Sequence, residues 1–267
     1  MGFLRRLFLT SCTFALLVSA AHAITLDWST VPWTAGSLAN SYDIDPAKPG
    51  NDITVTVSGN TAQLQPEVVP PNPMTPAITT DLQGGQANPV SSLCLAVNFT
   101  NQSQAVTVTV DFSSLYSLGV QNVSFTLFDV DFDNAAGSST YQDQLRNIVA
   151  TGVDGSQVAA TITTSGNNTL SGSGLTQIVD GIASGADTGA GSGNSNVTIS
   201  FGTNAIKSFT FTYGSGSGTV ADPTYQHVGI YDVNFTAVPE MNPAWSAVGS
   251  CLVAAVLILR HSAKFRK

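Results

Sequence analysis

The sequence predicts an all-β protein, an antiparallel β-sandwich for which a jelly roll is the expected type, flanked by an N-terminal signal helix and a C-terminal transmembrane helix. Three observations lead to this fold class. Apolar and polar residues alternate with period two through the middle of the chain, as they do in strands with one buried face. Clusters of Gly, Asn, Asp and Ser separate these runs. No useful length of the middle region follows the helical period.

The first 23 residues have the three parts of a secretory signal peptide. Arg5 and Arg6 provide a positive start, residues 7–18 are apolar, and the small residues Ala21 and Ala23 precede the expected cleavage point. Cleavage after Ala23 leaves residue 24 as the start of the exported chain. The alternative is a signal that stays uncut and serves as an anchor.

The exported middle of the chain, residues 24–237, has a length that suits one all-β domain. The alternating runs that predict its strands are 53–57, 93–99, 105–112, 123–132, 146–153, 158–163, 197–201, 206–213 and 228–235. Short strands at such spacing, separated by turn residues, favour an antiparallel sandwich.

Two stretches interrupt the alternation. Residues 66–76 hold five prolines, which predicts an extended surface loop. Residues 171–196 are rich in Gly, Ser, Asn, Asp and Thr, with one apolar island at 175–182, and are expected to form a long loop across one end of the sandwich.

The exported region is strongly acidic. Of the nine Lys and Arg residues, three lie in it (Lys48, Arg146 and Lys207), together with 16 of the 17 acids, so its net charge is about −13 (3 minus 16). Nucleic acid is therefore excluded as a partner, because phosphate contacts need Lys and Arg. The charge is compatible with bound divalent cations and equally with a self-repelling, soluble surface.

The cysteines do not form a disulfide framework, since Cys12 lies in the signal and Cys251 in the tail. Cys94 is the one cysteine of the exported region and stands in an apolar strand pattern. We expect it to be a buried small hydrophobic residue.

The sharpest local feature is a repeated motif, Phe-Asp-Val-Asp-Phe at 128–132 and Tyr-Asp-Val-Asn-Phe at 231–235. On strands, the aromatic residues and Val of each copy face one way and the acids face the other. If the two strands are neighbours, their oxygen atoms gather and suit Ca²⁺. The predicted ligands are Asp129, Asp131, Asp133, Asp232 and Asn234. The alternative is an ordinary row of solvent-facing side chains.

A second acidic stretch could also hold a metal ion. It comprises Asp43, Asp45, Asn51 and Asp52, near the first predicted strand.

Catalytic motifs are missing from the sequence, so we predict that the protein is not an enzyme. The exported region has one histidine, His227, and one glutamate, Glu67, which stands on the proline-rich stretch. No nucleophile motif accompanies His227, and no phosphate loop, Rossmann glycine pattern or Cys/His metal spacing is present.

The C-terminal tail has three parts. Residues 238–243 form a polar linker that begins Val238-Pro239-Glu240; residues 244–259 are an uncharged apolar segment, predicted to be a transmembrane helix; and residues 260–267 are a basic cytoplasmic end. Trp245 stands at the entry of the apolar segment, where an aromatic ring favours the membrane interface. The alternative to a membrane segment is an amphipathic core helix, and the alternative to a tail that is cleaved is a single-pass anchor that is never cut.

This tail resembles the PEP-CTERM sorting signal of Gram-negative bacteria in its Val-Pro-Glu motif, short membrane helix and terminal basic cluster. Met241 stands where the family motif usually has its last proline. The resemblance implies recognition by an integral-membrane exosortase, cleavage near Val238, Pro239 and Glu240, and delivery to the cell surface or extracellular matrix.

Three functions remain open at this point. The leading hypothesis is a non-catalytic exported surface or matrix protein with an adhesive or structural role. The alternative is a carbohydrate-binding module, favoured if aromatic side chains form an exposed row. The aromatic candidates are Trp28, Trp33, Tyr42, Tyr141, Tyr213 and Tyr225. A secreted polysaccharide hydrolase or lyase is favoured only if acids and His227 meet in a cleft.

Overall fold

The computed structural model describes residues 22–68, 71–87, 90–112, 114–133, 141–182, 191–223 and 225–239. Residues 23–238 form one compact unit. The predicted signal peptide up to residue 21, the apolar segment 244–259 and the basic end lie outside the described residues. A search of the described part of the chain found no helix with the length and apolar character needed to span a bilayer.

The described strands are all paired antiparallel and build two series. In the first series β3 (Ile53–Gly59), β6 (Ala105–Phe112), β15 (Ile206–Ser215) and β9 (Tyr141–Gly152) follow one another as neighbours. The short strand β2 (Ala39–Tyr42) extends this series beyond β3. Beyond β9 lie β8 (Phe132–Asp133), β10 (Gln157–Ala159), β13 (Ile178–Gly181) and β12 (Asn168–Ser171).

The second series is centred on β7 (Val120–Phe128). On one side β7 pairs with β14 (Val197–Gly202), which pairs with β11 (Thr161–Thr164). On its other side lie two strands in line, β16 (Gln226–Ile230) and β17 (Val233–Ala237). Beside β17 lies β1 (Ala23–Leu26), and beside β16 lie β5 (Ser92–Val97) and then β4 (Ala77–Thr79).

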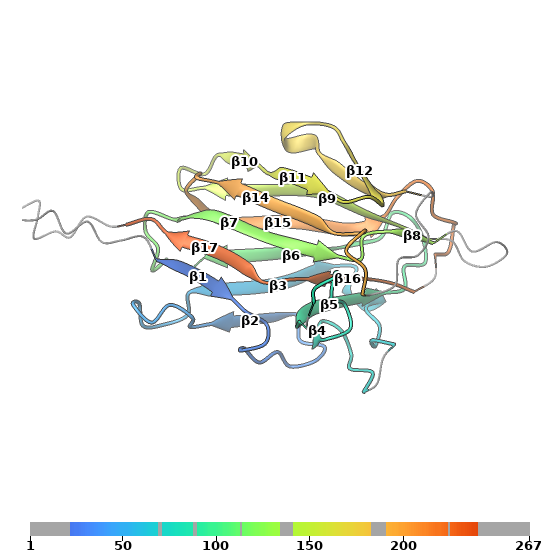
Figure 1. The fold of residues 1–267 in the computed structure, drawn as a ribbon, viewed down its shortest axis with the longest axis horizontal. Coiled ribbons are helices and arrows are strands. Elements are labelled where there is room, and N and C mark those ends of the chain that lie inside the picture. Colours follow the sequence, from blue (N-terminus) through green and yellow to red (C-terminus); the bar gives the residue numbers. More distant parts are fainter. Residues whose placement is uncertain are drawn as a thin grey trace, which may run out of the picture. The chain divides into compact units, whose positions relative to one another are not determined.

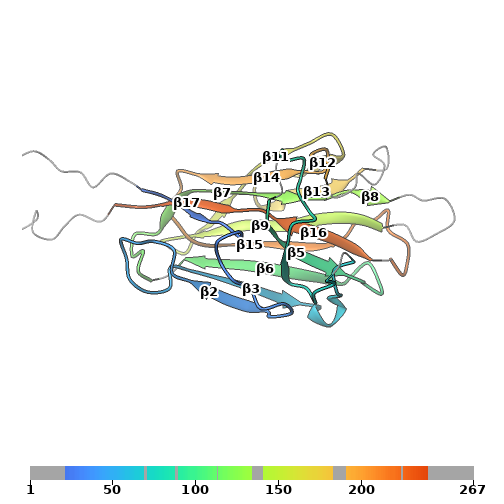
Figure 2. The same ribbon diagram turned by 60° about the horizontal axis from the view of Figure 1, so that its bottom comes forward.

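The two series face each other across the main hydrophobic core, as the two views of the ribbon show (Figure 1, Figure 2). Phe125 of β7 stacks on Phe209 of β15 with ring centroids 4.7 Å apart, and Phe112 of β6 lies 4.9 Å from Phe235 of β17. Each such side chain contributes about 2–3 kcal/mol by leaving water. The all-β, antiparallel, sandwich-like prediction is therefore confirmed.

Each predicted strand run coincides with one or two observed strands, because long alternating runs carry a clear signal. Three of the runs are markedly shorter or divided, and one of them, 158–163, is divided at Ala160 into β10 (Gln157–Ala159) and β11 (Thr161–Thr164). Within the run 123–132, strand β7 ends at Phe128. The strand ends there because the next residue, Asp129, has a left-handed backbone conformation with φ 67°. The run 228–235 is divided at Tyr231 and Asp232 into β16 and β17. The short strands β1, β2, β4, β12 and β13 were not predicted, because they are too short for alternation to show.

The proline-rich segment is extended as predicted, but its stem is not on the surface. Glu67 N donates to Pro73 O, so the segment doubles back on itself. Glu67 and Thr75 are each only 1% exposed, which corrects the prediction of a surface loop. The stem is buried because it lies along β5, where Gln65 N and the Thr75 hydroxyl both donate to Ala96 O.

The glycine-rich stretch 171–196 also contains regular structure. Its apolar island forms a 3₁₀ turn (Gly174–Thr176) and the strand β13, which pairs with both β12 and β9. The loop prediction is therefore wrong for this island, because Val179 is fully buried against β9. Residues 183–190 of the stretch lie outside the described residues.

Candidate functional site

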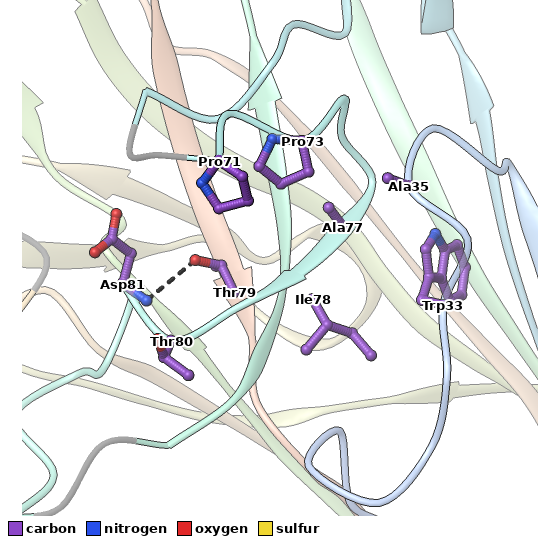
Figure 3. A pocket seen from close by; sticks show the side chains of 9 residues that line it. All are labelled: Trp33, Ala35, Pro71, Pro73, Ala77, Ile78, Thr79, Thr80 and Asp81. Carbon is purple, nitrogen blue, oxygen red and sulfur yellow. Dashed lines mark hydrogen bonds between the residues drawn. The ribbon is translucent and has the colours of Figure 1, made fainter.

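A pocket of about 390 Å³ lies beside the outer strand β4 (Figure 3). Three segments line it, and the first of them is distant in sequence from the other two, which are consecutive. These are the β1–β2 connection, the proline-rich segment, and β4 with the residues after it, which contribute Trp33, Ala35, Pro71, Pro73, Ala77, Ile78, Thr79, Thr80 and Asp81. Figure 3 shows Trp33 and Asp81 at opposite ends of this pocket, with Ile78 between them.

Local contacts hold these segments in place. Trp33 packs edge-on against the buried ring of Trp28, with centroids 6.2 Å apart. Gly36 N donates to Pro76 O at 3.0 Å, which ties the β1–β2 connection to the proline-rich segment. At the other end Asp81 N donates to Thr79 Oγ1 at 3.1 Å, drawn as the dashed line in Figure 3.

The pocket combines an apolar wall with a polar end. Trp33, two prolines and Ile78 form the apolar part, and Thr79, Thr80 and Asp81 form the polar part. Burial, and after it the negative charge of Glu67, raises the pKa of the Asp81 carboxyl. A few convergent polar groups in an apolar recess are typical of sites for small polar molecules or chain segments.

The aromatic candidates do not form an exposed row among the described residues. Trp28, Tyr42 and Tyr213 are buried, and Trp33, Tyr141 and Tyr225 are half-buried. Trp33 is the one candidate among them that lines the pocket. The extended platform considered from the sequence is therefore not present in this part of the chain.

Near Asp81 the structure assembles a second group, here called the His227 cluster: Glu67, Cys94, Asp129 and His227. His227 Nε2 lies 2.7 Å from Asp129 Oδ2, and His227 Nδ1 lies 3.7 Å from Glu67 Oε1. The Cys94 thiol donates to Glu67 Oε2 at 2.7 Å. Nδ1 of His227 is buried and has no hydrogen-bond partner, because 3.7 Å exceeds hydrogen-bond length.

Strand register explains how this cluster forms. On paired strands, His227 lies opposite Ala96, and Gly229 lies opposite Cys94. Cys94 and His227 are therefore diagonal neighbours on the same face, within reach of each other. This face is the one away from the main core, where Cys94, Ala96, Leu82 and Phe128 form a small hydrophobic cluster of their own.

Two further segments complete the cluster from outside the strands. Glu67 enters from the buried stem of the proline-rich segment. Asp129 follows β7, and its φ of 67° turns the chain out of the strand. Tyr225 donates its hydroxyl to Glu67 Oε1 at 3.1 Å.

Charge interactions inside the cluster are strong. Burial disfavours the imidazolium, but hydrogen bonding to Asp129 and the negative charges of Asp129 and Glu67 outweigh it and raise the pKa of His227 to about 10. Burial likewise favours the neutral form of Glu67, but its interactions with His227 and the Cys94 thiol lower the pKa of Glu67 to about 2. Without a metal ion, the cluster is therefore a carboxylate–imidazolium–carboxylate array at neutral pH.

Cys94, His227 and Asp129 have the residue types of a nucleophilic triad, but the burial of Cys94 opposes that chemistry. Cys94 is fully buried, and this burial, together with Glu67, raises the pKa of its thiol well above the usual range. A nucleophilic cysteine needs an accessible thiolate. The expectation that Cys94 is buried is confirmed, although its thiol is a hydrogen-bond donor as well as a packing group.

The acids predicted to bind calcium are separated by the register of β7, although the strands are neighbours as the prediction required. Phe128 pairs with Gly229, whereas Asn234 pairs with Ser124. Asn234 is therefore five residues (129 minus 124) along β7 from Asp129, roughly 16 Å. Asn234 is therefore apart from Asp129, although the first residues of the two copies, Phe128 and Tyr231, stack with ring centroids 5.1 Å apart.

The individual acids of the motif have separate partners. Asp232 Oδ1 accepts from Trp28 N, and Asn234 Oδ1 accepts from the Thr25 hydroxyl. Asp131 is 1% exposed and accepts from the Tyr141 hydroxyl, and Asp133 lies half-buried in β8. Of the predicted calcium ligands, Asp129 alone belongs to the His227 cluster, which combines carboxylate, thiol and imidazole groups.

The second acidic stretch forms a closed hydrogen-bonded group, here called the Asp52 cluster: Asp45, Asp52 and Tyr116. Asp52 Oδ2 accepts from the backbone N–H groups of Ile44 and Asp45, at 2.7 and 2.6 Å. The Tyr116 hydroxyl lies 3.1 Å from Asp45 Oδ2 and 3.3 Å from Asp52 Oδ1. The carboxylates are used to hold the loop before β3.

The His227 cluster was not predicted from the sequence, although the amino-acid composition of residues 24–237 contained an indication of it. Glu67, Cys94 and His227 are the single glutamate, cysteine and histidine of residues 24–237. Three singly occurring, chemically versatile residues meet at one place in space. Nothing in their spacing of 27 and 133 residues (94 minus 67, 227 minus 94) indicates this meeting.

Comparisons with known proteins identify no family for this chain. No family model matches the sequence, and no curated protein matches it. Among solved structures, the chain is similar to a carbohydrate-binding module specific for non-crystalline cellulose, CBM28, with 13% identity and a TM-score of 0.28 over 60% of this chain and 78% of that one.

A second similar structure is the N-terminal domain of the Streptococcus gordonii adhesin Sgo0707. Its identity is 13% and its TM-score 0.30, over 68% of this chain and 42% of that chain. Likenesses of this strength establish neither a ligand nor a detailed topology for the protein.

Proposed function

We propose that this protein is a non-catalytic, exported surface or matrix module that binds polysaccharide in the pocket between Trp33 and Asp81. The observation that supports it is the composition of the pocket, which has an indole at one end, carboxylate and hydroxyl groups at the other, and two prolines and Ile78 between them (Figure 3). A sugar ring has the same two-sided character, with an apolar C–H face and hydroxyl groups at its edge.

The size and chemistry of the pocket suit one or two sugar units. Its volume of about 390 Å³ lies in the lower range for small-ligand sites. In this proposal Trp33 packs on the C–H face, because aromatic rings bury large area with few rotatable bonds. Asp81 and the Thr80 hydroxyl accept hydrogen bonds from the sugar. With one aromatic contact, binding by a single domain is weak, and display of many copies on a surface supplies avidity.

Export and attachment are part of the same proposal and rest on the sequence. The signal peptide sends the domain out of the cytoplasm, and the tail anchors the precursor in the membrane. An exosortase-like enzyme then acts near Val238, Pro239 and Glu240. A jelly-roll topology for the sandwich-like domain also belongs to this proposal. Deleting residues 244–267 should release the domain into the soluble fraction, and continued membrane association of that variant would remove the anchor from the proposal.

The hydrolase alternative is not favoured by the geometry. It required His227 and acids to meet in a cleft. They do meet, but Glu67, Asp129 and His227 do not line the pocket, and Glu67 is 1% exposed. A substrate bound in the pocket would contact Asp81 and threonines, without a second acid from the lining to complete a glycosidase pair.

A glycan array with residues 24–237 tests the binding function, because this segment holds the main hydrophobic core. We expect a small set of polysaccharide fragments to bind the parent domain, and binding to fall at least tenfold in Trp33→Ala and in Asp81→Asn. Leu175→Ala, at an exposed position outside the lining, is the matched control and should bind as the parent does. Equal binding by the parent and Trp33→Ala would refute the assignment of the pocket.

A further inference from the structure

We propose that the His227 cluster is a zinc site in which Glu67, Cys94 and His227 are the ligands and Asp129 positions the histidine. This inference is independent of the sugar-binding function, because none of these four residues lines the pocket. It also differs from the calcium prediction, since the ligand set is nitrogen, sulfur and oxygen from three separate segments.

The distances between the proposed ligand atoms are close to those found around a tetrahedral zinc ion. One carboxylate oxygen of Glu67, Sγ of Cys94 and one ring nitrogen of His227 all lie within 4.8 Å of one another, and His227 Nδ1 lies 3.7 Å from Glu67 Oε1. Around tetrahedral zinc, with bonds of about 2.0–2.3 Å, neighbouring ligand atoms are roughly 3.3–3.8 Å apart. The Cys94 Sγ–Glu67 Oε2 distance of 2.7 Å is that of a hydrogen bond, so zinc entry widens it by about 1 Å. Three protein ligands leave the fourth tetrahedral position to water.

The histidine is oriented as a metal ligand would be. Its Nε2 binds the carboxylate of Asp129, while its Nδ1 is buried, faces Glu67 and has no hydrogen-bond partner. Metal-bound histidines almost always give their other ring N–H to a carboxylate or carbonyl, which fixes the tautomer and the ring direction. Asp129 is held for this contact by a left-handed backbone conformation that few non-glycine residues adopt.

Charge balance allows the exchange of protons for metal. With the thiol neutral, His227 protonated and both carboxylates ionised, the cluster carries −1. With zinc bound, the Cys94 thiolate and two carboxylates contribute −3, neutral His227 contributes none and the ion contributes +2, which again gives −1. One zinc ion therefore replaces two protons, one from Cys94 Sγ and one from His227 Nδ1, without adding net charge to a buried site.

The choice of metal follows from the ligands. Thiolate and imidazole together select zinc among the abundant divalent ions, whereas Ca²⁺ takes six to eight oxygen ligands. The position of the site decides what a bound ion connects. Glu67, Cys94, His227 and Asp129 come from the proline-rich segment, β5, β16 and the residue after β7, so a bound ion ties together four segments on the outer face of one layer.

Metal analysis of the full, untagged chain in mild detergent tests the site. The protein is stripped with a chelator, dialysed against zinc chloride and then against metal-free buffer. We expect one zinc per chain and a higher melting temperature than the stripped protein, because a ligand that binds only the folded state stabilises it. Cobalt chloride in place of zinc should give a thiolate-to-cobalt charge-transfer band in the near ultraviolet.

Variants separate this site from other metal-binding groups in the chain. Cys94→Ser keeps a hydrogen-bond donor for Glu67 but removes the sulfur, and should lower zinc affinity at least about 100-fold and abolish the charge-transfer band. Asp129→Asn should weaken affinity about 10- to 100-fold while the band remains, as expected of a positioning residue. Cys251→Ser is the matched control and should change neither.

Two outcomes would overturn the proposal. One is less than half an equivalent of zinc on the folded parent chain after dialysis. The other is equal affinity of the parent and a Cys94→Ser variant whose circular dichroism shows it to be folded. The cobalt spectrum of the parent needs no substitution, so a missing charge-transfer band would count against the site even if Cys94→Ser did not fold.

Discussion

The His227 cluster and the Asp52 cluster are both buried groups of acidic side chains, yet they differ in what satisfies them. In the Asp52 cluster the donors are backbone N–H groups close in sequence, from Ile44, Asp45 and Ala47, with one tyrosine hydroxyl added. In the His227 cluster one donor is the neighbouring backbone N–H of Val68, the others are side chains from distant segments, and one ring nitrogen has no hydrogen-bond partner. Carboxylates whose hydrogen bonds come mainly from donors nearby in sequence stabilise a loop. A cluster of oxygen, sulfur and nitrogen atoms in which one nitrogen has no hydrogen-bond partner can instead bind an ion.

This comparison teaches that the number of acids in a sequence is a poor guide to metal binding. The Asp52 cluster comes from an acid-rich stretch, and its carboxylates are already occupied. The His227 cluster contains the single glutamate, cysteine and histidine of residues 24–237, and tertiary folding alone brings them together. The predictions below separate the two groups by stability and by zinc dependence.

The largest effect is expected from Asp52→Ala. The substitution leaves two buried backbone N–H groups without their acceptor and removes one acceptor of the Tyr116 hydroxyl. At about 1–3 kcal/mol for each unsatisfied group, the free energy of unfolding should fall by about 4 kcal/mol. Urea unfolding measures it, and the loss should be the same with zinc and with chelator. A zinc-dependent loss would mean that this cluster is not closed.

His227→Gln should have the next largest effect in chelated protein. It leaves the carboxylates of Glu67 and Asp129 without their shared cation in a largely buried setting. Since His227 is one-fifth exposed, we expect a loss near the lower end for a broken buried ion pair, about 3 kcal/mol at pH 7. Urea unfolding with and without zinc is the measurement. Stability within 1 kcal/mol of the parent would show that the cluster contributes little without metal.

The pH dependence of chelated protein should distinguish the parent from His227→Gln. The folded pKa of His227, about 10, is above its usual 6.5, so its contribution to stability is complete below pH 6.5 and is lost as the pH rises toward 10. The folded pKa of Glu67, about 2, is below its usual 4.5, so its contribution is complete above pH 4.5 and is lost as the pH falls toward 2.

The parent should therefore exceed the His227→Gln variant in unfolding free energy most clearly between pH 4.5 and 6.5. The difference should shrink on both sides of that window. Urea unfolding of both proteins across the pH range provides the data. A difference that grows between pH 7 and 10 would contradict the sign of the His227 shift.

The smallest effect is expected from Cys94→Ser in the presence of chelator. The hydroxyl retains a hydrogen bond to Glu67, so the free energy of unfolding should change by less than about 1 kcal/mol. With zinc, however, the parent should gain stability and the variant should not, so the gap between them should open. Thermal unfolding in both conditions measures it. Equal stabilisation of both proteins by zinc would place the ion elsewhere.

Much of the fold could be predicted from sequence because strands carry a local signal. The run at 105–112 alternates in sequence, and β6 shows the same alternation in its burial. Where the signal failed, a tertiary contact had decided the outcome. The first copy of the repeated motif, at 128–132, predicts a continuous strand. Instead the chain leaves β7 at Asp129, whose carboxylate contacts His227. Glu67 was placed on a surface loop, but the stem of that loop is buried along β5.

The sequence by itself determined the all-β class, most strand positions and the acidic character of residues 24–237, and it predicted the targeting segments, because these depend on short-range patterns of polarity and charge. Tertiary structure alone decided which acids meet. The offset between β7 and β17 separates Asn234 from Asp129, and the pairing of β5 with β16 makes Cys94 and His227 diagonal neighbours. Register and loop path set these distances, and neither is encoded in the spacing of the residues along the chain.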